Sequence, residues 1–235
     1  MKYILRKSED RIHKKDEWKT SAYAFVPFQT NFGELCGFAD DIVQPGKGFG
    51  MHPHKNMEIS TIVIDGAQSH KDDTGSEGIV DAKCVQTMSA GTGIMHSEYN
   101  ASATESFHSF QIWVYPKELN VLPRHEKFVF DPKDKKNRVL LALSPDGRNN
   151  TAKINQDAFF SLSELEKDMK VNYTMNMSNN GVYIHCAKGT VNIEDNLIHE
   201  GDAIGIYETS AISILALQNA ELIFVEVPMQ RGIKL

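Results

Sequence analysis

Two short segments carry paired side chains of the kinds that bind metal ions. Met51-His52-Pro53-His54 places two imidazoles two residues apart, and His96-Ser97-Glu98 repeats this spacing with an imidazole and a carboxylate. In an extended strand, residues i and i+2 project from the same face, so each pair can direct both side chains at one ion. Three nitrogens and one oxygen leave open coordination positions on a metal such as Fe(II). We therefore predict a site for one divalent metal, formed by His52, His54, His96 and Glu98.

Glycines precede both pairs. The alternative interpretation is that each pair, taken alone, is a chance feature of a surface strand. Gly46, Gly48 and Gly50 precede the first pair, and Gly91 and Gly93 precede the second. Glycine-rich segments suit tight turns that bring ligand-bearing strands together. The repetition therefore favours a real site.

The other histidines and the cysteines have less distinctive surroundings. His108 lies in a predicted strand and His70 in a glycine-rich turn. Either could hydrogen-bond a ligand or substrate, although an ordinary hydrogen-bonded polar residue is the simpler interpretation. We expect His185 and Cys186 to be core or strand residues. We assign no role to His13, His125 and His199.

The elements that must position these residues are predicted to be strands. Short apolar or alternating runs such as Ile59 to Ile64 and Phe107 to Tyr115 recur along the chain, separated by turn-forming clusters. This pattern is typical of an all-β sandwich or barrel. We predict one short helix, Ser163 to Met169, because Ser163 and Glu166 have capping-box spacing.

A charged, proline-containing segment, Asp131 to Arg138, is the predicted linker between two domains. The predicted domains are residues 1–130, which carry the metal site, and residues 131–235, which do not repeat the ligand pairs.

Composition narrows the possible function. The 235 residues are 41% hydrophobic, with a formal net charge of -6, so the chain can bury a core but presents no basic surface for nucleic acid or anionic lipid. The first residues form no signal peptide, and no apolar run is long enough to span a membrane. The three widely spaced cysteines favour a reduced, cytoplasmic compartment. We expect a monomer.

The metal-binding segments resemble the cupin motifs. Gly46, the two histidines of the first pair and Glu58 match the first motif, and the segment Gly91 to Asn100 resembles the second. More narrowly, His70 to Gly75, Gln86 to Gly91 and Gly93 to Glu98 are similar to the signature of the pirin family, which includes bacterial quercetin 2,3-dioxygenases. The resemblance implies two cupin barrels in one chain, with the metal in the N-terminal barrel only.

This resemblance also bears on the acidic residues. Cupins at large often use the first-motif glutamate as a ligand, which would implicate Glu58 and makes it an alternative base. Pirins instead use the position of Glu98, which we favour as ligand and general base, with Glu58 beside the metal or facing the cavity. The implied metal is Fe(II), although the donor set also accepts Ni, Mn, Co, Cu or Zn.

Two functions are compatible with the resemblance. The first is a dioxygenase that uses O2 to open the heterocyclic ring of a flavonol-like aromatic, with release of carbon monoxide. The second is a metal- and redox-dependent regulator that binds a transcription factor or a metabolic enzyme. The two functions require different surroundings of the metal. A dioxygenase needs an apolar pocket that opens onto the metal, whereas a regulator needs only a redox-sensitive surface.

Overall fold

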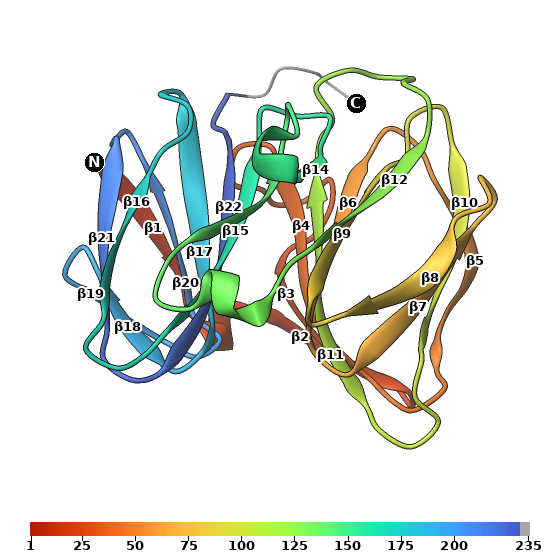
Figure 1. The fold of residues 1–235 in the computed structure, drawn as a ribbon, viewed down its shortest axis with the longest axis horizontal. Coiled ribbons are helices and arrows are strands. Elements are labelled where there is room, and N and C mark those ends of the chain that lie inside the picture. Colours follow the sequence, from red (N-terminus) through yellow and green to blue (C-terminus); the bar gives the residue numbers. More distant parts are fainter. Residues whose placement is uncertain (231–235) are drawn as a thin grey trace.

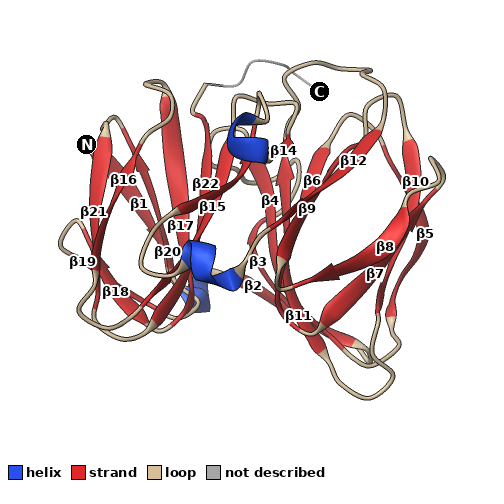
Figure 2. Cartoon of the chain, viewed as in Figure 1, coloured by secondary structure: helices blue, strands red, loops and turns tan. Residues whose placement is uncertain are grey.

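The computed structural model describes residues 1–230, which form two β-barrels side by side (Figure 1). Each barrel combines a seven-stranded and a four-stranded sheet. Apart from three short 3-10 helices, Ser8–Asp10, Pro132–Lys135 and Arg148–Asn150, the regular structure consists of strands (Figure 2). The all-β, two-barrel cupin architecture predicted from the sequence is therefore confirmed. No helix among the described residues is long and apolar enough to cross a membrane.

The first barrel holds the predicted ligands. Its larger sheet comprises, in spatial order, β12 (Arg124–Val129), β9 (Cys84–Ser89), β6 (Glu58–Asp65), β11 (Phe107–Val114), β4 (Leu35–Val43), β3 (Lys19–Phe25) and β2 (Ile12–Lys15). Its smaller sheet comprises β5 (Gly48–His54), β10 (Ile94–Asn100), β7 (Ala67–Asp72) and β8 (Glu77–Asp81).

The second barrel has the same plan but includes the first strand of the chain. Its larger sheet comprises β1 (Lys2–Arg6), β20 (Ala203–Tyr207), β17 (Asn180–Lys188), β22 (Ala220–Pro228), β15 (Phe159–Leu165), β13 (Leu140–Ser144) and β14 (Ala152–Lys153). Its smaller sheet comprises β16 (Lys170–Thr174), β21 (Ala211–Ala216), β18 (Thr190–Ile193) and β19 (Asn196–His199). The predicted division into residues 1–130 and 131–235 remains a proposal, and it did not anticipate that β1 pairs with β20.

The predicted helix at Ser163 to Met169 is wrong, because Ser163 to Leu165 end strand β15 and the residues that follow form a turn. Ser163 pairs with Leu222 of β22, and its hydroxyl donates a hydrogen bond to the carbonyl of Arg138 at 2.8 Å. Pairing on both edges of β15 outweighs a local capping pattern, since tertiary context overrides weak propensities. In the predicted linker, Asp131 instead caps the 3-10 helix Pro132–Lys135.

Strand β11 shows how the alternating sequence separates two environments. Phe110, Ile112 and Val114 are fully buried in the largest apolar cluster, which also includes Tyr183 and Val225 of the second barrel. The intervening residues Gln111 and Trp113 face the interior of the first barrel. One strand therefore joins the inter-barrel core to the wall of the predicted site.

Tyr183 provides a test of this inter-barrel core. Its side chain is buried against Phe25 and Phe38, and burial raises the pKa of its phenol. No described residue hydrogen-bonds its hydroxyl. Because an unpaired buried hydroxyl is unfavourable, we expect Tyr183→Phe to raise the free energy of unfolding by about 1 kcal/mol, measured by urea unfolding of the metal-free protein.

Tyr173→Phe is the matched control for that measurement. The Tyr173 hydroxyl donates a 2.8 Å hydrogen bond to the buried carboxylate of Glu226, so its loss should lower the free energy of unfolding by about 1–3 kcal/mol. Equal destabilisation by both variants would show that the Tyr183 hydroxyl has a partner in solution.

Candidate metal centre

Three of the predicted ligands converge inside the first barrel. His52 on β5 lies directly opposite His96 on the neighbouring antiparallel strand β10. The ring centroids are 4.4 Å apart for His52 and His96, 4.9 Å for His54 and His96, and 4.8 Å for His52 and His54. One nitrogen from each ring lies within 4.8 Å of the others, which is compatible with binding a common ion.

The hydrogen bonding of these rings fits a metal. His52 Nδ1 lies 2.7 Å from the carbonyl oxygen of Gly50, and an N–H donated to that oxygen leaves the Nε2 lone pair free. His96 is 1% exposed, and no described residue hydrogen-bonds either of its ring nitrogens. Because buried polar atoms are nearly always satisfied, the unpaired nitrogens of His96 are compatible with a cation bound among the three rings.

His54 and His96 are also in the protonation state that a metal needs. Burial, reinforced by His52, lowers the pKa of His54 to about 4. Burial and the neighbouring histidines lower the pKa of His96 to about 3. Both imidazoles are therefore neutral near pH 7, with a lone pair available for coordination.

Glu98 lies beside the three histidines, and its carboxylate is hydrogen-bonded by other residues. Its oxygens accept hydrogen bonds of 2.8 Å from the side-chain amides of Gln68 and Gln111, and burial raises the pKa of the carboxyl. It belongs to a second group of possible ligands, with His70 and His96, whose donor atoms also lie within 4.8 Å of one another. The structure therefore contains two overlapping groups that share His96, and coordination by all four predicted residues remains a proposal.

Histidines outside the predicted quartet complete the surroundings of Glu98. His70 lies on strand β7 rather than in a turn, hydrogen-bonded through Nε2 to Asp72 at 3.0 Å and stacked on His125 with ring centroids 4.5 Å apart. The position of His70 and His125 next to the site was not predicted from the sequence. The spacing His70-Lys71-Asp72 repeats the two-residue interval of the ligand pairs and was the available signal.

The structure contradicts the place predicted for Glu58. Its carboxylate accepts hydrogen bonds from the Ser89 hydroxyl at 2.6 Å and from the backbone N–H of Asn155, in the second half of the chain, at 3.0 Å. Glu58 pairs with Val114, on the face of the sheet opposite Trp113 and the metal-binding rings. Burial raises the pKa of Glu58 to about 7, but its contacts join the two halves of the protein and do not reach the cavity.

The remaining residues considered from the sequence lie elsewhere. His108 contacts Asp40, with Nε2 and Oδ1 2.6 Å apart, and His185 and Cys186 are buried as expected. His13 and His199 are exposed. Both groups of possible metal ligands found among residues 1–230 lie in the first half of the chain.

An aromatic pocket adjoins the histidine group. It has a volume of about 240 Å³, and its lining includes Tyr23, Phe25, Phe38, Phe49 and Trp113. Two of these rings contact the ligands: Trp113 lies edge-on to His54 with ring centroids 4.9 Å apart, and Phe49 lies 6.2 Å from His52. Gly37 makes room for Trp113, because an added Cβ would lie 2.8 Å from the tryptophan Cβ.

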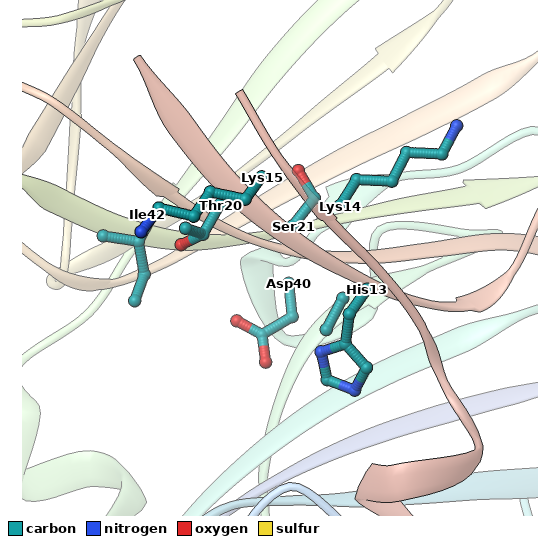
Figure 3. A pocket seen from close by; sticks show the side chains of 8 residues that line it. His13, Lys14, Lys15, Thr20, Ser21, Asp40 and Ile42 are labelled. Carbon is teal, nitrogen blue, oxygen red and sulfur yellow. The ribbon is translucent and has the colours of Figure 1, made fainter. Parts of the chain in front are cut away.

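The opposite face of the same strands lines a separate pocket (Figure 3). Ala22 and Asp40 line this pocket, whereas the next residues along each strand, Tyr23 and Asp41, line the aromatic one. His13 and Asp40 border the same space in Figure 3. Because side chains alternate along a strand, a substitution on this face leaves the aromatic pocket untouched.

Comparison with known families assigns both halves of the chain. Residues 6–114 match the family model described as Pirin. Residues 141–227 match the model described as Quercetinase C-terminal cupin domain.

Individual relatives match over nearly the whole chain. A protein of Escherichia coli K12 named quercetin 2,3-dioxygenase is 38% identical over 95% of this chain and 98% of that protein. The crystal structure of YhhW from Escherichia coli, 36% identical, superimposes with a TM-score of 0.91 over 99% of this chain and all of YhhW. A structure of bacterial pirin YhhW in complex with nickel(II), also 36% identical, covers 97% of this chain and 99% of that chain, with a TM-score of 0.89.

Proposed function

Because this chain belongs to the pirin family, we propose that it is a metal-dependent dioxygenase that opens the heterocyclic ring of a flavonol-like aromatic with O2 and releases carbon monoxide. The observation that carries the proposal is the aromatic pocket, whose Trp113 and Phe49 contact His54 and His52. Apolar, aromatic-lined pockets with a few polar groups are typical of small-molecule sites. A regulatory protein needs no aromatic pocket next to its metal site, so the pocket supports the enzyme.

His52, His54, His96 and Glu98 are the proposed metal ligands. When bound, a divalent transition metal supplies Lewis acidity toward the substrate's hydroxyl and carbonyl oxygens and a redox-active centre for O2. Fe(II) is our proposed physiological metal, and the nickel complex of the Escherichia coli relative supports a divalent ion.

The chain's own residues prepare the substrate. The aromatic walls exclude water and orient the flat ring system against the histidines, which reduces the entropic cost of reaction. Glu98, held by Gln68 and Gln111, is the base that accepts the proton of the substrate hydroxyl.

The direct test is anaerobic reconstitution of the metal-free protein with Fe(II), followed by addition of quercetin and air. We expect loss of flavonol absorbance together with release of carbon monoxide. His52→Ala should be inactive, and His199→Ala, an exposed residue of the second barrel, should behave like wild type. Metal binding without flavonol consumption would contradict the proposal.

Glu98→Gln separates proton transfer from metal binding. The amide keeps the size of the side chain but cannot accept the substrate proton, so we expect kcat to fall by about a hundredfold or more. More metal should remain bound than in the histidine variants, as measured by mass spectrometry of the metal content. Unchanged kcat would exclude Glu98 as the base.

A further inference from the structure

A polar cluster occupies part of the aromatic pocket. Lys19, Tyr23 and Asp41 line the same cavity as Gln111 and Trp113. Lys19 Nζ lies 3.2 Å from the Tyr23 hydroxyl and 3.7 Å from the Asp41 carboxylate. Asp41 in turn accepts a short hydrogen bond from Ser21. The pocket therefore has a charged group in addition to the polar residues beside the metal ligands.

The strand register places Asp41 of this cluster away from Gln111, which lies near the proposed metal ligands. Tyr23 of β3 lies opposite Ala39 of β4, which lies opposite Gln111 of β11. Asp41 is two residues farther along β4 than Ala39, which corresponds to about 7 Å in a strand. A planar ligand that reached the metal near Gln111 could therefore place its far ring beside Asp41 and Lys19.

Lys19 has hydrogen-bonding capacity that the fold does not use. It is 9% exposed, and its ammonium lies 4.8 Å from the centroid of the Phe49 ring and 5.6 Å from that of Trp18. An ammonium group has three N–H donors, and the polar partners of Lys19 within the described part of the chain are the Tyr23 hydroxyl and, at the longer distance of 3.7 Å, the Asp41 carboxylate. The surrounding aromatic rings stabilise the cation but accept no conventional hydrogen bond, so a donor remains for a ligand.

We propose that Lys19, together with Tyr23 and Asp41, is a second recognition point that selects aromatic substrates bearing a hydroxyl oxygen on the ring farther from the metal. This inference rests on the proposed dioxygenase function, which requires that the substrate reach the metal at the end of the pocket near Gln111. Lys19 donates a hydrogen bond to the ring oxygen, and Asp41 accepts the hydrogen of that hydroxyl. A substrate without the hydroxyl cannot use the remaining N–H donors of Lys19 or the remaining acceptor capacity of Asp41, which is the physical basis of discrimination.

The test compares the binding of quercetin, which carries hydroxyls on its outer rings, with that of 3-hydroxyflavone, which carries none there. Isothermal titration calorimetry on zinc-loaded protein measures binding without turnover. We expect wild type to bind quercetin at least about tenfold more tightly than 3-hydroxyflavone, since hydrogen bonds to charged groups have this effect. Lys19→Met should remove most of this preference and change the dissociation constant of 3-hydroxyflavone by less than about twofold.

Lys15→Met, an exposed lysine of β2, is the matched control and should retain the wild-type preference. If Lys19→Met does not fold, Asp41→Asn provides the same comparison. Equal weakening of both ligands, or an unchanged preference, would overturn the inference while leaving the dioxygenase proposal intact. If neither flavonol binds to wild type, the proposed function fails and this inference fails with it.

Discussion

The His96→Ala variant should lose its metal and its flavonol turnover while keeping its fold. His96 lies at the centre of the site, opposite His52 and shared by both groups of possible ligands. Replacing His96 removes one nitrogen ligand from each of these two groups. We therefore expect metal affinity to fall by more than about a hundredfold and kcat to fall below detection. Metal content per chain and quercetin consumption are the two measurements.

The fold should survive because the apolar cores lie elsewhere. The largest cluster is between the barrels, and the second fills the C-terminal barrel. Far-UV circular dichroism of His96→Ala should therefore match that of wild type. An unfolded variant would show that the ion organises the first barrel, contrary to our expectation. His108→Ala, on strand β11 of the larger sheet and in contact with Asp40, is a suitable control for the loss of an imidazole.

Filling the aromatic pocket should stop turnover without releasing the metal. Ala39 lies on the pocket wall between Tyr23 and Gln111. Ala39→Phe would place a phenyl ring in a space of about 240 Å³, so we expect kcat/KM for quercetin to fall by about a hundredfold or more. The metal content, measured in parallel, should remain that of wild type because none of the proposed ligands is altered.

Ala22→Phe is the control for that substitution. Ala22 is on the adjacent strand but lines the pocket on the opposite face of the sheet. The Ala22→Phe substitution adds the same ring as Ala39→Phe and should leave quercetin turnover unchanged. If Ala39→Phe also turned over quercetin normally, the aromatic pocket would not be the substrate site.

The ligand pairs were predictable because their information is local. Two residues two apart on a strand share a face wherever the strand lies, so His52 and His54 could be assigned to one ion before the strand partners were known. The motif resemblance then brought His96 to the same site. The all-β class followed from alternation and turn spacing, which are also local.

The sequence alone did not show which face of a sheet each residue occupies, or which distant strands pair. Glu58 is close to the ligands in sequence, but strand alternation turns it toward the second barrel, where Asn155 binds it. His70 is distant in sequence from Glu98, yet the pairing of β7 with β10 places the two residues opposite each other. Ser163 carried a helix-start pattern that two long-range strand pairings outweighed.

The position of β1 has a consequence for how the protein is made. Lys2 and Glu208, joined by a salt bridge between β1 and the residue after β20, are 206 residues apart in the sequence. During synthesis β1 leaves the ribosome long before its partner strand, and contacts of such large sequence separation form slowly. The strands of the first barrel all precede β20, so the first barrel can assemble while β1 still waits for its partner.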